Sequence, residues 1–96
     1  MNDQTLKDLS NIVKKRMLEK PKGSYVTELT KAGKVKIANK LGEEAFETVS
    51  AFLAQNKNEI AQESADLIFH LVVLLEFSDS SLDDVINVLK KRMKDD

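Results

Sequence analysis

The sequence predicts an all-α protein of four to five helices in a bundle that is completed by homodimerisation. Apolar residues recur at intervals of three and four along most of the 96 residues, which is the period of an amphipathic helix. One segment, 67–75, is apolar almost all round, as in a buried helix. A chain this short buries only about 60–65% of its unfolded surface, so pairing with a second copy would add to its core.

Composition limits the class of protein further. The length suits one domain spanning residues 1–96, and 42% apolar residues suffice for a packed core. The chain has no cysteine, which excludes disulfides and thiolate metal sites. Its net charge of −1 argues against nucleic-acid binding. The first residues lack the pattern of a signal peptide and no apolar run suits a membrane span, so we expect a cytoplasmic protein without a membrane partner.

The first two predicted helices are short and clearly bounded. Residues 3–19 carry one apolar stripe, which consists of Leu6, Leu9, Ile12, Val13 and Met17. Asn2 or Asp3 can cap this helix, and Pro21 and Gly23 end it. Ser24 can then cap a second helix over residues 25–31, which ends at Ala32-Gly33.

The third predicted helix covers residues 34–55 and has two distinct sectors. Its apolar face consists of Val35, Ala38, Leu41, Ala45, Val49 and Phe52. A second sector, about 100° wide, carries the charged residues Lys36, Lys40, Glu43, Glu44 and Glu47. The connector 56–58 is short, with Asn58 as the expected N-cap, so the next helix should run back antiparallel.

The fourth predicted helix spans about residues 59–77, and its apolar half is expected to be buried. Residues 78–80 form a turn. Ser81 and Asp84 resemble a capping box that starts a last helix, which runs to about Lys94. The residues of this helix expected to point inward are Leu82, Val85, Ile86 and Leu89.

Acidic residues at helical spacing form one cluster in each long predicted helix. The clusters are Glu43, Glu44 and Glu47 in the first helix, and Glu63 and Asp66 in the second, with His70 one turn further on. An antiparallel hairpin can place the clusters opposite each other, where each charge disfavours ionisation of its neighbours. Desolvating these anions beside an apolar helix is costly without a cation. We therefore predict a Mg²⁺ site, because this ion takes oxygen ligands and commonly bridges carboxylates to substrate phosphates.

Each of these residues also has a purely structural interpretation. The Glu43, Glu44 and Glu47 motif alone is more typical of a solvated helix face than of a metal site, and only the two acidic clusters together favour the metal. Lys36 and Lys40 either pair with acidic neighbours on their helix or bind a phosphate beside the metal. The only histidine, His70, is either a hydrogen-bonded core residue or a neighbour of the site. Gly42 costs about 1 kcal/mol inside a helix relative to alanine, which close approach of another helix or of substrate would explain.

The chain resembles phosphoribosyl-ATP pyrophosphatases of histidine biosynthesis. The resemblance covers nearly the whole chain and is carried by the segment from Lys36 to Glu47, by the segment from Glu63 to Leu71, by Gly23-Ser24-Tyr25, and by Ser81-Leu82 with Val85. The two acidic motifs are shared more widely, by all-α nucleotide pyrophosphatases of MazG and dimeric dUTPase type. Phe69 and Val26 depart from the residues that family members often carry at these positions.

The resemblance implies a MazG-like homodimer that hydrolyses phosphoribosyl-ATP to phosphoribosyl-AMP and pyrophosphate with Mg²⁺. By the superfamily pattern the metal ligands are Glu44, Glu47, Glu63 and Asp66. Glu43 or Glu47 would activate the attacking water, and Lys36, Lys40 and His70 would contact substrate. The alternatives are a house-cleaning nucleoside triphosphate pyrophosphatase with the same metal site, and a non-catalytic helical dimer whose acidic stripe is solvated surface.

Overall fold

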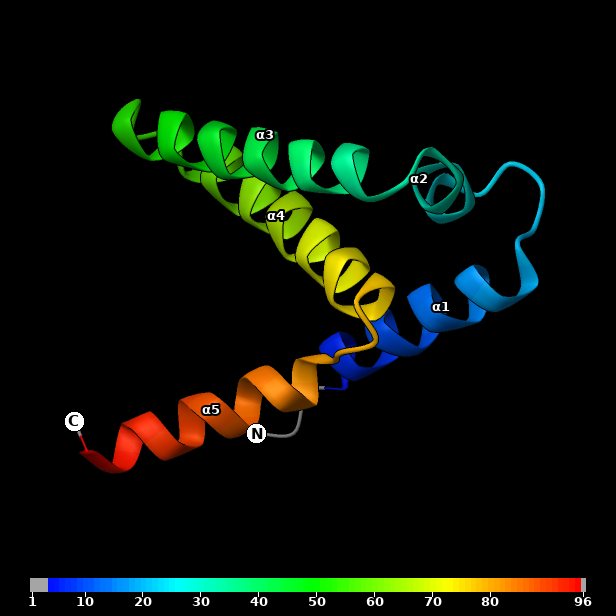
Figure 1. Cartoon of the computed structure of the whole chain (residues 1–96). Coiled ribbons are helices and arrows are strands. Elements are labelled where there is room, and N and C mark those ends of the chain that lie inside the picture. The colour runs from blue at the N-terminus through cyan, green and yellow to red at the C-terminus, as the bar shows by residue number, and fades with distance from the viewer. Residues whose placement is uncertain (1–3, 96) are drawn as a thin grey trace.

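The computed structural model describes residues 4–95 and consists of five helices, with no strand among these residues (Figure 1). The helices are α1 (Thr5–Glu19), α2 (Tyr25–Ala32), α3 (Lys34–Leu53), α4 (Lys57–Phe77) and α5 (Leu82–Asp95). The predicted all-α class is confirmed. None of these helices is both long enough and apolar enough to cross a bilayer.

Local sequence signals set the limits of α1 and α2. Helix α1 begins at Thr5, with Gln4 in the N-cap position. The predicted caps Asn2 and Asp3 lie outside the described residues. It ends at Lys20, which adopts the left-handed conformation (φ 51°) before Pro21, because proline disfavours a right-handed helical residue before it. The predicted Ser24 cap is confirmed, since its hydroxyl accepts a hydrogen bond from the Thr27 amide.

Helices α3 and α4 form the antiparallel hairpin on which α1 and α2 pack, and Figure 1 shows the end of α3 meeting the start of α4 at one corner. The position predicted for the cap of α4 is wrong by two residues. Asn56, not Asn58, is the N-cap, and its side chain accepts from the Glu59 amide. Helix α3 accordingly ends at Leu53 rather than residue 55, because Gln55 takes a left-handed conformation (φ 59°) that reverses the chain.

A small apolar core joins four of the helices. Its fully covered members are Val13, Val26, Leu29, Ile37, Val72 and Val73. They come from α1, α2, α3 and α4, so α2 is fixed against the hairpin by its own buried side chains. The prediction that the apolar half of α4 is buried is only partly right. Val72 and Val73 are enclosed, whereas Ile68 is 39% exposed.

Helix α5 projects away from the hairpin and touches mainly α1 (Figure 1). The predicted capping box at its start is confirmed, because the Ser81 hydroxyl accepts from the Asp84 amide and the Asp84 carboxylate accepts from the Ser81 amide. The inward placement predicted for its apolar residues is wrong for Ile86 and Leu89, which are 38% and 50% exposed. Nothing in residues 4–95 buries these two side chains.

The apolar face predicted for α3 is likewise uncovered within the chain. Val35 is 72% exposed, Val49 53% and Phe52 66%. The buried residues of α3 are instead Ile37, Glu44 and Ala51, which lie on another side of the helix. A Cβ atom placed on Gly42 would meet no described atom within 4 Å beyond its own stretch of helix, so no other described helix approaches it closely.

Candidate metal centre and active site

Three carboxylates from α3 and α4 converge in the middle of the hairpin. Glu44, Glu63 and Asp66 each offer one oxygen, and these three oxygens lie within 4.8 Å of one another. Glu44 is buried, Glu63 is half-buried and Asp66 is exposed, so the group opens to solvent on the Asp66 side. The antiparallel hairpin brings together acidic residues that are about 20 positions apart in sequence.

The side chain of Glu47 lies beside this group, but Glu47 is not one of the three residues whose oxygens lie within 4.8 Å of one another. Glu47 is exposed, one turn after Glu44 on α3. It hydrogen-bonds to the Glu63 carboxyl, and this is the largest of the influences that raise the pKa of Glu63 to about 7. The nearby negative charge of Glu47 therefore favours the neutral form of the Glu63 carboxyl.

Burial and mutual repulsion act on Glu44 in the same direction. Its pKa is raised, first by burial and then by the neighbouring charges of Glu47 and Asp66. One oxygen of Glu44 and one of Glu63 are buried and have no hydrogen-bond partner. Buried polar atoms are normally satisfied, so two unpartnered carboxylate oxygens on neighbouring residues of this group need a cation or a proton.

These observations fit a divalent cation that prefers oxygen ligands. The donor set contains only carboxylates, and neighbouring side chains supply neither thiolate nor free imidazole. Such a set suits Mg²⁺, which binds one or two carboxylates directly and keeps several waters. Glu44, Glu63 and Asp66 would hold the ion, and Glu47 is close enough to join them or to bind one of its waters.

Lys36 and Lys40 lie on the same sector of α3 but differ in exposure. Lys40 is largely covered, with its side chain 22% exposed, and its ammonium lies 3.6 Å from Glu43. Its pKa is raised, chiefly by the Tyr25 phenol, against the opposing effect of burial, with Glu43 and Glu44 adding to the rise. Lys36 is exposed on the far part of the polar sector. Lys40, one turn before Glu44, is therefore the better placed cation for an anionic ligand.

His70 is buried, and both of its ring nitrogens are engaged. Nδ1 is 2.8 Å from the backbone oxygen of Asp66, and Nε2 is 3.0 Å from the hydroxyl of Tyr25. The ring thus links the turn that carries Asp66 to the first residue of α2. Sequence reasoning did not assign Tyr25 to the site. The available signal was an aromatic residue directly after the Ser24 cap, and only the fold brings it to His70.

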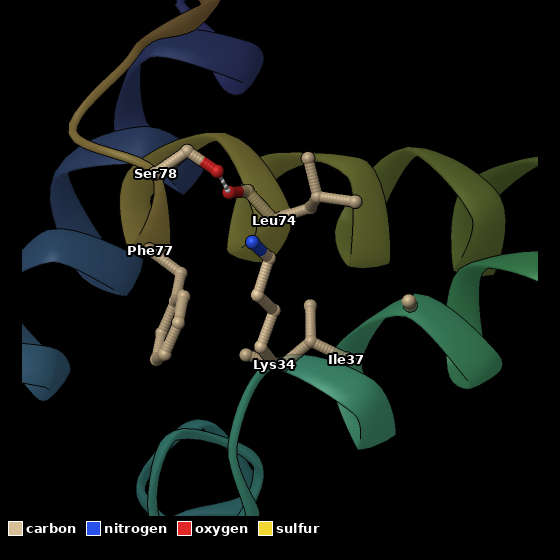
Figure 2. A pocket seen from close by; sticks show the side chains of 6 residues that line it. Lys34, Ile37, Leu74, Phe77 and Ser78 are labelled. Carbon is tan, nitrogen blue, oxygen red and sulfur yellow. Dashed lines mark hydrogen bonds between the residues drawn. The ribbon is translucent and has the colours of Figure 1, made fainter.

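Two hollows flank the α3–α4 hairpin. One, of about 480 Å³, lies at the acidic group and is lined by Glu47, Ser50, Ala51, Ala54, Glu59 and Glu63. The other, of about 340 Å³, is mainly apolar and lies where α3 begins and α4 ends (Figure 2). In Figure 2 the side chains of Lys34, Leu74 and Phe77 surround it, and no carboxylate lines it. The hollow at the acidic group is the one with the chemistry for a metal-bound phosphate.

The fold and the acidic group are those of an all-α protein with a candidate metal centre, and comparison with known proteins shows its family. Residues 6–93 match the family model described as Phosphoribosyl-ATP pyrophosphohydrolase. This chain belongs to that family.

Curated relatives named phosphoribosyl-ATP pyrophosphatase are similar over nearly their whole length. The relative from Metallosphaera sedula is 47% identical over 89 residues, which is 93% of this chain and 96% of the relative. Those from Zymomonas mobilis and Rhizobium meliloti are 45% and 44% identical, each over 96% of this chain and 86% of the relative. The family that the sequence resembles is thereby confirmed.

Proposed function

We propose that this protein hydrolyses phosphoribosyl-ATP to phosphoribosyl-AMP and pyrophosphate, a step of histidine biosynthesis, with Mg²⁺ held by Glu44, Glu63 and Asp66. The observation that carries this proposal is the group of three carboxylate oxygens within 4.8 Å, in a chain of this family. We also propose a single domain over residues 1–96 and a cytoplasmic location, where nucleotide substrate and Mg²⁺ are both available.

Different side chains would bind the substrate and take part in proton transfer. When bound, Mg²⁺ neutralises charge on the phosphates and orients them for attack by water at the α–β anhydride. Lys40 provides a covered ammonium for a phosphate oxygen, with Lys36 further out. Glu47 hydrogen-bonds to Glu63 and lies at the hollow, so it is well placed to accept a proton from the attacking water. Glu43, paired with Lys40, would act at the edge of the site.

Release of pyrophosphate from phosphoribosyl-ATP, measured beside a panel of ordinary and deoxynucleotides, tests the substrate. We expect turnover of phosphoribosyl-ATP in the presence of Mg²⁺ and much slower turnover of the panel. Faster hydrolysis of dUTP or another free nucleotide would contradict the proposal and favour the house-cleaning pyrophosphatase. Absence of hydrolysis with every substrate, and of any Mg²⁺ effect on thermal stability, would favour the non-catalytic dimer.

We further propose that two copies of the chain form a homodimer through the uncovered apolar faces. On α3 the face exposes Val35, Phe46, Val49, Phe52 and Leu53, and on α5 it exposes Ile86, Val88, Leu89 and Met93. Large apolar side chains exposed in this number on one helix are more typical of an interaction site than of a monomer surface. A second copy is the occupant that suits a short chain whose core lacks these residues.

Introducing a charge into this face should separate the two copies. We expect Phe52→Glu to be a monomer at micromolar concentration in light scattering, where the parent is a dimer, because the interface would have to bury an unpaired carboxylate. Leu18→Glu is the matched control, since Leu18 is a similarly exposed apolar residue (79%) on α1, away from these faces. A monomeric parent, or equal effects of both substitutions, would contradict the proposed interface.

A further inference from the structure

Three aromatic rings form a cluster where the start of α2 meets α4, and they belong to Tyr25, Phe69 and His70. The rings of Tyr25 and Phe69 stack, with centroids 6.0 Å apart and planes inclined by 26°. The His70 ring stands nearly perpendicular to both, with its centroid 5.7 Å from that of Tyr25 and 5.2 Å from that of Phe69. Stacked and edge-to-face contacts are the arrangements that aromatic rings prefer, so the cluster holds its members in fixed orientations.

Hydrogen bonds fix the Tyr25 side chain further and use its hydroxyl inside the protein. The backbone oxygen of Asp66 can only accept, so Nδ1 of His70, 2.8 Å away, carries a proton and donates to it. In the neutral ring Nε2 is then unprotonated and accepts a hydrogen bond from the Tyr25 hydroxyl at 3.0 Å. Because the hydroxyl is turned toward the buried His70, the part of Tyr25 left for a ligand is its ring.

Tyr25 is more exposed than a side chain that serves only the core. It is 42% exposed, and its stacking partner Phe69 is half-buried. The other apolar residues of α2, Val26 and Leu29, are 1% and 3% exposed and already fix that helix against the hairpin. The exposure of Tyr25 therefore leaves aromatic surface that a further planar group can cover.

This aromatic surface adjoins the open side of the acidic group. Phe69 follows Asp66 by one helical turn on α4, and the His70 ring is hydrogen-bonded to the Asp66 backbone. Asp66 is the exposed member of the three converging carboxylates. A base on the rings and phosphates on the metal would therefore be separated along α4 by about 5 Å, one turn of helix, which is the scale of the sugar that joins them.

We propose that Tyr25 and Phe69 form a stacking platform for the base of the nucleotide whose phosphates bind at the acidic group. The ligand class is a planar heteroaromatic base, which stacks on aromatic side chains through its π face. This inference rests on the proposed function for the identity of that base as the adenine of phosphoribosyl-ATP. Pyrophosphate has no base, so its binding reports the metal centre without the platform.

Tyr25→Leu removes the ring and keeps an apolar residue that suits a helix. We expect the Kd of α,β-methylene-ATP with Mg²⁺, an analogue that resists cleavage between its α- and β-phosphates, to rise about tenfold, as for the loss of one base stack. The Kd of pyrophosphate with Mg²⁺ should stay within about twofold. Tyr25→Phe should recover most of the lost affinity because it keeps the ring. Phe77→Leu is the matched control, since Phe77 is an aromatic residue of similar exposure (39%) at the apolar hollow, and it should change neither constant.

Fluorescence tests the contact directly, because the chain contains no tryptophan. Tyr25→Trp keeps an aromatic face and places a single indole at the platform. We expect α,β-methylene-ATP with Mg²⁺ to quench its emission, since the stacked base contacts the indole, and pyrophosphate with Mg²⁺ to leave it unchanged. Phe77→Trp places the indole at the apolar hollow and should respond to neither ligand.

The outcomes separate the platform from the function on which it rests. Equal weakening of both ligands in Tyr25→Leu, an equal loss in Tyr25→Phe, or an unquenched Tyr25→Trp would overturn the platform. So would a parent that binds pyrophosphate but not the analogue. A parent that shows the expected base-dependent binding but does not hydrolyse phosphoribosyl-ATP would overturn the proposed function and leave the platform standing.

Discussion

Glu63→Gln is expected to lower kcat/KM by about 10²–10³-fold, the range for losing one group that stabilises charge in a transition state, while the protein keeps its fold. The carboxyl of Glu63 is one of the three converging groups and has a buried oxygen without a partner. An amide of the same shape offers a poorer metal ligand and cannot take the negative charge that balances the cation. The loss should therefore appear mainly through weakened metal binding.

The same substitution should not destabilise the metal-free protein. Glu44, Glu63 and Asp66 repel one another when no cation is bound, and a neutral side chain relieves part of that repulsion. The control is Glu76→Gln, which makes the same change in a half-buried residue near the other end of α4. It should retain full activity. Equal activity of Glu63→Gln and the parent would remove Glu63 from the site.

The stability of the metal-free protein should change with pH in a direction that identifies Glu63. The pKa of this carboxyl rises from 4.5 to about 7 on folding, so the folded state favours its neutral form. The associated stabilisation is fully present below pH 4.5 and is lost as pH rises through about 7. Stability that falls as pH rises is the opposite of what a carboxylate in a salt bridge gives, because such a carboxylate stabilises the fold at high pH. Ionisation of Glu63 is thus unfavourable unless a cation is present.

Thermal melts in EDTA across this pH range, with Glu63→Gln beside the parent, isolate the effect. We expect the melting temperatures of the two proteins to be similar near pH 4.5, and the variant to become progressively the more stable as pH rises through about 7. Saturating Mg²⁺ should reverse the difference, because it binds the folded parent with its carboxylates ionised. A difference that is flat with pH would contradict the raised pKa of the Glu63 carboxyl.

Local signals in the sequence predicted most of the helix boundaries. The Ser24 cap and the box formed by Ser81 and Asp84 both follow from side chains that bond to backbone amides within three residues, so no tertiary information is needed. The convergence of Glu44, Glu63 and Asp66 also followed, because spacing within each helix and a short connector fix an antiparallel hairpin. The cap of α4 was misplaced because Asn56 and Asn58 carry the same signal, and only the conformation of Gln55 selects between them.

The remaining features depend on contacts that periodicity does not encode. Hydrophobicity alone indicates that Val49 and Phe52 face inward, yet Glu44 lies on the side of α3 that packs on α4. An apolar face can be covered by a second copy instead of by the same chain, and the sequence pattern is identical in both cases. Tyr25 was missed because its partners Phe69 and His70 lie on α4, and His70 is 45 residues away in the sequence, so only the fold brings them together.

Titration of the metal-free protein with Mn²⁺, a spectroscopic substitute for Mg²⁺, followed by competition with Mg²⁺, tests most directly whether the acidic group of α3 and α4 is a metal centre. We predict saturable binding by the parent and by Glu76→Gln, and at least about tenfold weaker binding by Glu63→Gln, as expected when a ligand is lost. Affinity should rise with pH through about 7, as the Glu63 carboxyl loses its proton. Equal binding by all three proteins, or no saturable binding by the parent, would contradict the account.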